Sequence, residues 1–124
     1  DRIAAEQAKS DQVLLMSYAN EDALKRAHEQ EMQMIDTAVA TAKLQLENQQ
    51  RTLASLLSLA AEAERAKKPV PENIAKSIGK VRSQIEEQNT FMVRQEEIRA
   101  QSSKDFEAVL ARYRDLVAKQ AARH

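Results

Sequence analysis

Residues that interrupt helices are nearly absent from this chain of 124 residues, which contains one glycine and two prolines. Barrels, sandwiches and doubly wound sheets need many glycine-rich turns, so this composition excludes those folds. The two prolines, Pro69 and Pro71, lie together near the middle of the chain. Because proline lacks an amide hydrogen and disfavours helix in the residue before it, they predict one reversal between two long helices.

The predicted fold class is all-α, with a long antiparallel two-helix coiled-coil hairpin and a short N-terminal helical or irregular segment. Residues 1–19 form this lead segment, which we expect to pack on the hairpin or on a partner. Residues 20–124 form the hairpin, with helices over about 21–67 and 71–120 and a turn at 68–71. Asn20 is a suitable N-cap for the first long helix. Lys67 and Lys68 place positive charge at its C-terminal end.

Apolar residues recur every seven residues in both long helices, and 18 of the 24 positions selected by this repeat are apolar. Such a repeat, sustained over several heptads, predicts a coiled coil. We call these the seam positions. They are 28, 32, 35, 39, 42, 46, 49, 53, 56, 60 and 63 in the first helix, and 74, 78, 81, 85, 88, 92, 95, 99, 102, 106, 109, 113 and 116 in the second.

The register of the predicted hairpin follows from arithmetic, since facing residues of an antiparallel pair have a nearly constant sum of residue numbers. A sum of 137 or 138 places Leu53 against Ile85 and Met32 against Phe106. The same sum places Gln49 in one layer with Gln88. We interpret this pair as setting the register, because slippage would place an amide against an aliphatic side chain. The alternative is two glutamines turned to the hydrated rim.

The middle of the second helix is polar at its seam, while Phe91 and Ile98 lie one position aside. Local rotation of the helix, a loosely packed hinge or coverage by a second chain would each explain this pattern. We favour a second chain, because a wide apolar face is typical of bundles with more than two helices. The prediction is a homodimer that forms a four-helix bundle. The predicted core and interface residues are Leu53, Leu56, Leu57, Ile78, Ile85, Phe91, Met92, Ile98, Phe106 and Tyr113.

The sequence offers little for catalysis or cofactor binding. The chain has no cysteine, and its 19 basic and 19 acidic residues give no net charge that would favour nucleic acid. No apolar run approaches the ~18–20 residues needed to span a membrane. His28 lacks the convergent acidic and histidine partners of a helical-bundle metal site. We therefore predict no enzymatic activity, no cofactor, no metal site, no nucleic-acid partner and no transmembrane segment in this chain.

Short motifs at residues 11–18, 21–24, 68–72 and 111–114, together with Phe106, resemble those of an uncharacterised family of proteobacterial coiled-coil proteins. Members of that family look like exported envelope proteins, so the resemblance implies a periplasmic or envelope-associated location and another envelope protein as a second partner. Because the chain begins with Asp1, we expect a segment to precede it. The predicted function is a non-catalytic interaction or scaffold protein. The alternative is an envelope chaperone, holdase or adaptor that binds clients through apolar ends of the bundle.

Overall fold

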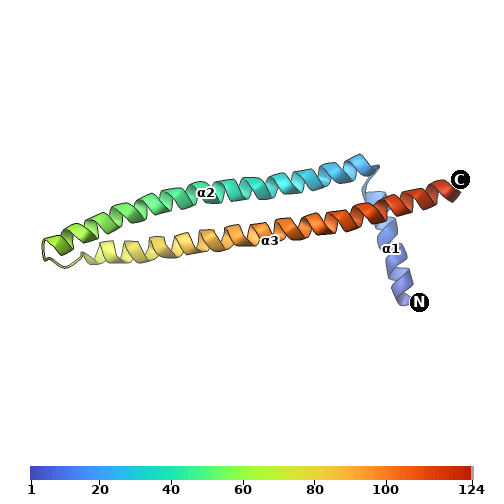
Figure 1. The fold of residues 1–124 in the computed structure, drawn as a ribbon. Coiled ribbons are helices and arrows are strands. Elements are labelled where there is room, and N and C mark those ends of the chain that lie inside the picture. The colour runs from blue at the N-terminus through green and yellow to red at the C-terminus, as the bar shows by residue number, and fades with distance from the viewer. Residues whose placement is uncertain (124) are drawn as a thin grey trace. The chain divides into compact units, whose positions relative to one another are not determined.

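The computed structural model describes residues 1–123, which form three helices and no strand, and this confirms the all-α class. The helices are α1 (Arg2–Ser17), α2 (Glu21–Arg65) and α3 (Glu72–Arg123) (Figure 1). Helix α2 ends two residues before the expected limit of 67. Helix α3 extends three residues beyond the expected limit of 120.

Side-chain caps define where the first two helices begin. The carboxylate of Asp1 accepts a hydrogen bond from the Ile3 amide at 3.1 Å. The Asn20 side chain accepts one from the Ala23 amide at 2.8 Å. Each cap satisfies an amide that the helix itself leaves without a partner, which fixes the first turn.

The chain reverses through a backbone motif that precedes the prolines. The amide of Lys68 donates to the carbonyl of Ala63 at 2.9 Å, and the amide of Lys67 donates to that of Glu64 at 3.0 Å. Lys67 adopts a φ of 56°, the left-handed conformation that closes a Schellman motif. Helix α2 therefore ends by its own hydrogen bonding, and Pro69 and Pro71 shape the connection that follows.

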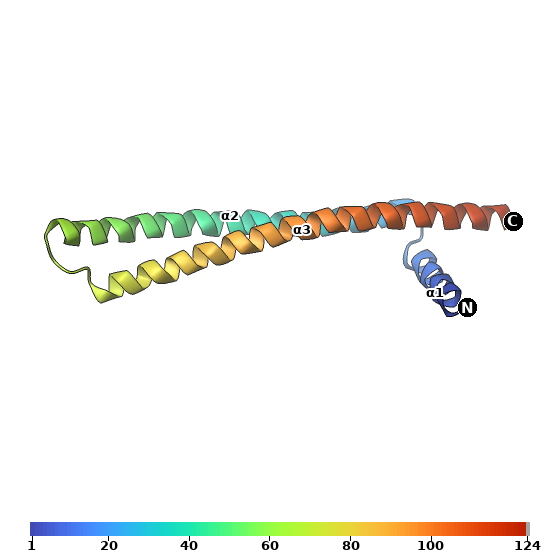
Figure 2. The same cartoon turned by 60° about the horizontal axis from the view of Figure 1, so that its bottom comes forward.

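Residue contacts divide the chain into two compact units. Unit 1 comprises Asp1–Met34 and Ile98–His124, and unit 2 comprises Ile35–Glu97. In unit 2, the segments 35–65 of α2 and 72–97 of α3 lie side by side as an antiparallel hairpin, as both views show (Figures 1 and 2). In unit 1, α1 joins the first turns of α2 and the last turns of α3.

Almost all seam positions are covered within their own unit. Of the 24 positions, 23 are buried or half-buried, and Arg99 is exposed. The buried hydrophobic side chains are Leu24 and Tyr113 in unit 1, and Ile35, Ala42 and Val81 in unit 2. Most other seam side chains are only half-buried, so the core of each unit is thin.

The predicted register is wrong by about one helical turn in each unit. In unit 1, Phe106 stacks on His28, with ring centroids 4.0 Å apart, rather than facing Met32. In unit 2, the side-chain amide of Gln88 donates to Gln45 at 2.6 Å rather than pairing with Gln49. A displacement of three or four residues carries one seven-residue series onto the other, so seam positions still face seam positions after the slip.

Candidate interaction surface

The predicted core residues fall into two groups. Phe106 is half-buried and Tyr113 is buried, with 4% exposure, in unit 1. The half-buried members in unit 2 are Leu53, Leu56, Ile78, Ile85 and Met92. These seven side chains contribute to the seam of the single chain.

Three of the residues predicted to lie in the core or at an interface are exposed in the single chain. Leu57 and Phe91 are each 39% exposed in unit 2, and Ile98 is 43% exposed in unit 1. Each lies one position aside from the seam, where a two-helix layer leaves one side of the side chain in solvent. Their role at an interface with a second chain stays a prediction.

The two predicted register-setting glutamines lie near each other but are not bonded to each other. Gln49 and Gln88 line one hollow of unit 2, of about 440 Å³. Gln88 instead bonds to Gln45, which is exposed, whereas Oε1 of Gln49 is buried without a hydrogen-bond partner among residues 1–123. A bond at the exposed edge is favoured because each glutamine can keep its remaining contacts with water there.

One face of the unit 2 hairpin carries almost no charge. It contains two adjoining hollows of about 470 and 440 Å³, whose lining shares Gln45, Glu87 and Gln88. Small and uncharged side chains supply the rest of this surface, which we call the amide face. Its residues are Ala38, Thr41, Ala42, Gln45, Asn48 and Gln49 of α2 and Gln84, Gln88 and Phe91 of α3, and Glu87 is the one charged residue that lines the two hollows.

The charges of α2 lie away from the amide face. Between Thr37 and Ala61 the charged residues are Lys43, Glu47 and Arg51, which recur every four residues and are exposed. Spacing of this kind keeps them together on the helix surface. The sequence contains this signal in the spacing of the charges, but a face made of threonine, asparagine and glutamine has no apolar periodicity.

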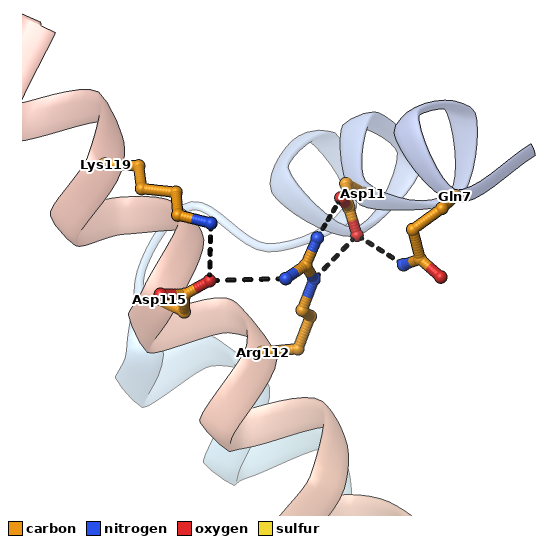
Figure 3. A network of polar contacts seen from close by, with 5 residues as sticks. All are labelled: Gln7, Asp11, Arg112, Asp115 and Lys119. Atoms are coloured by element: carbon orange, nitrogen blue, oxygen red, sulfur yellow. Dashed lines mark hydrogen bonds and ion pairs between the residues drawn. The ribbon is translucent and has the colours of Figure 1, made fainter. Parts of the chain in front are cut away.

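A polar network in unit 1 attaches α1 to α3 (Figure 3). The Arg112 guanidinium donates through Nε to Oδ1 of Asp11 at 3.0 Å and through Nη2 to Oδ2 of the same carboxylate. On its other side, Nη1 of Arg112 lies 3.2 Å from Asp115, which also binds Lys119 at 3.1 Å. Gln7 donates to Asp11 at 2.9 Å. The two-pronged contact fixes the orientation of α1 as well as its attachment.

Two further contacts hold the connection between α1 and α2. The Tyr113 hydroxyl donates to the backbone carbonyl of Tyr18 at 3.1 Å, and Arg114 binds the Glu21 carboxylate. The hydrogen bond from Arg114 lowers the pKa of Glu21 to about 2, with Lys25 adding to the effect. A hydrogen bond from Arg112 likewise holds the pKa of Asp11 below its usual value. Both carboxylates are therefore ionised, and their ion pairs formed, at neutral pH.

A groove of about 550 Å³ lies in unit 1 around the stacked His28 and Phe106 rings. Tyr18, Leu24 and Val109 are among the residues that line it.

Two kinds of feature are absent from the part of the chain that the structure describes. Among residues 1–123, no group of three or more histidine, cysteine, aspartate or glutamate side chains is placed to hold a metal ion. None of the helices over the same residues combines the length and hydropathy that a membrane span requires.

Comparison with protein-family models, with curated proteins and with solved structures gave no match. Inference about function therefore depends on the chemistry of the amide face and of the polar contacts between α1 and α3.

Proposed function

We propose that this protein is a non-catalytic interaction protein that works by helix packing and self-association, as a dimer of hairpins in a four-helix coiled-coil bundle. The supporting observation is the small amount of buried surface. The chain leaves 9446 Å² accessible to solvent. A compact monomer of 14.0 kDa would leave about 6,700 Å².

The composition of the exposed surface supports a second helical layer rather than a small-molecule ligand. Leu57, Phe91 and Val93 in unit 2 are exposed by 39%, 39% and 57%. Beside them, seam residues such as Leu53 and Ile85 are only half-buried. A second hairpin laid on one face of this layer would add burial to the exposed side chains of that face, and apolar burial is the main favourable term in association.

The mass of the purified protein in solution tests the proposal. Light scattering coupled to size exclusion at micromolar concentration is expected to give twice the chain mass of 14.0 kDa. Leu56→Asp would place an unpaired charge in the seam and is expected to lower helicity sharply, whereas Ser58→Asp, at an exposed position of the same helix, serves as its control. A monomeric mass across the micromolar range would overturn the proposal.

A second candidate, a chaperone or adaptor that holds unfolded clients, is favoured by the apolar surface of α1. Ile3, Val13 and Met16 are exposed by 71%, 58% and 79%. This candidate requires suppression of the aggregation of an unfolded test protein, and the triple replacement of these residues by serine would abolish that suppression. A dimer without such activity would remove this candidate and leave the first one standing.

We propose a periplasmic or envelope-associated setting, on the strength of the resemblance of residues 11–18 and 68–72 to envelope coiled-coil proteins. Fractionation of cells that express the natural gene tests it. Release of the protein by osmotic shock, or its presence in the membrane fraction, is expected, and retention with cytoplasmic markers would contradict it.

A further inference from the structure

We infer that the amide face of unit 2 docks a second copy of this chain, with α2 antiparallel to the partner's α2 and α3 antiparallel to the partner's α3. The inference rests on the proposed self-association and adds the surface and the register. The two-fold axis lies between the two copies. It passes α3 at the level between Thr90 and Phe91, and it passes α2 at a level between Thr41 and Gln45.

Charge complementarity along α3 fixes the position of this axis. Glu87 and Arg94 lie on either side of Phe91, and neither forms an ion pair within residues 1–123. An antiparallel pairing about the midpoint of residues 90 and 91 places Glu87 opposite Arg94 of the partner subunit. The two-fold axis repeats the pair, so two favourable contacts form from one arrangement of charges.

Phe91 then becomes the centre of the interface. It lies directly beside the axis and lines the hollow whose other walls include Ala38, Thr41 and Ala42. The rings of the two copies would meet at the axis above these small side chains. A half-exposed aromatic residue beside a hollow of small residues is typical of the anchors that contribute most to association.

The same axis is compatible with α2. Gln45 and Gln88 are bonded, so residues of unit 2 whose numbers sum to about 133 lie at one level. The level of residues 90 and 91 therefore corresponds to residues 42 and 43 of α2. Antiparallel pairing about this point places Thr41 opposite Gln45 of the partner subunit and Ala38 opposite Asn48 of the partner subunit.

These α2 pairs bring no charge into the interface. Hydroxyl and amide groups can donate and accept, so the Thr41 and Gln45 pair can be satisfied across the axis. Small residues such as Ala38 allow the helices to approach. The charged edge of α2, with Lys43 and Glu47, would stay in water. Desolvating those charges would oppose pairing through that edge.

The first test exchanges charges on α3. Glu87→Arg and Arg94→Glu, each alone, would place like charges opposite each other at two sites and are expected to raise the dimer Kd by about tenfold or more at low salt. The double variant Glu87→Arg with Arg94→Glu restores opposite charges and is expected to return the Kd to within about threefold of the original. Glu96→Arg, an exposed α3 position outside both hollows, is the control and should leave the Kd unchanged.

The second test uses the absence of cysteine from the chain. Mixing Ala38→Cys chains with Asn48→Cys chains under mild oxidation is expected to give a disulfide-linked dimer. Neither variant should cross-link to itself, because ten residues of helix separate equal positions by about 15 Å. Lys43→Cys, at the level of the axis but on the charged edge, is the control and should not cross-link.

The outcomes separate the two proposals. A monomeric parent chain would overturn the proposed function and this inference together. If the parent chain is dimeric, an unchanged Kd for both single charge reversals would overturn the docking face alone. Cross-linking of Lys43→Cys chains would overturn it as well. Circular dichroism of each variant identifies any loss of helix, and the restored Kd of the double exchange cannot arise from misfolding.

Discussion

Replacement of Gly79 by alanine is expected to stabilise the protein. Gly79 lies within α3 at an exposed position, and its φ is not positive. A Cβ added there would meet no atom within 4 Å. The change therefore introduces no clash, and it exchanges the least favourable residue but proline for the most favourable in a helix interior.

The expected gain is about 0.8–1 kcal/mol in the free energy of unfolding. With an unfolding entropy of about 2.1 cal/mol/K per residue, a chain of this length should melt about 3–4 °C higher. Urea denaturation followed by circular dichroism should move to a higher midpoint with the same slope. Protein concentration must be equal in all samples, because association also shifts the apparent stability.

Ser83→Ala, another exposed α3 position, is the matched control and should gain about half as much. The reasoning would be refuted if Ser83→Ala raised the free energy of unfolding above that of the parent chain while Gly79→Ala left it unchanged or lowered it. That result would mean that another surface approaches the backbone at Gly79, and the docking face inferred above does not place one there.

Three further changes test local features. Lys67→Gly relieves the left-handed conformation at the end of α2 and should add about 1 kcal/mol of stability, measured by thermal denaturation. Tyr113→Phe removes the donor to the carbonyl of Tyr18 and should cost about 0.5–1.5 kcal/mol in urea denaturation, and an unchanged midpoint would mean that the bond contributes nothing. The Glu21 pKa is lowered from 4.5 to about 2, so its ion pair with Arg114 stabilises the fold above pH 4.5 and is lost as the pH falls toward 2. The stability difference between the parent and Glu21→Gln should therefore shrink over that interval, and a constant difference would contradict the assignment.

The helices could be predicted from the sequence because their signals are local. Asn20 caps α2 as its side chain suggests, and the seam positions follow from spacing along one helix at a time. The register could not be predicted, because a slip of three or four residues still leaves seam positions facing seam positions. The decisive information lay in the end of α2, where Lys67 closes the helix before the prolines begin.

The candidate surfaces were harder to predict than the helices. The amide face is defined by the absence of charge, which leaves no apolar repeat to detect. The contact between Asp11 and Arg112 joins residues 101 positions apart, and nothing in the local pattern of either residue indicates the other. The sequence identifies Phe91 as an apolar residue outside the seam, but only the hollow beside it shows what it could anchor.

The spacing of these contacts along the chain also has a kinetic consequence. Gln45 and Gln88 in unit 2 are 43 residues apart, whereas the contacts of α3 with α1 and with the connection from α1 to α2 in unit 1 join residues 93 to 101 apart. Closing the longer loops from an open chain costs about 0.8 kcal/mol more in entropy. Unit 2 is thus the natural nucleus, and substitutions there should slow folding. Substitutions among the α1 contacts should leave the folding rate alone and speed unfolding.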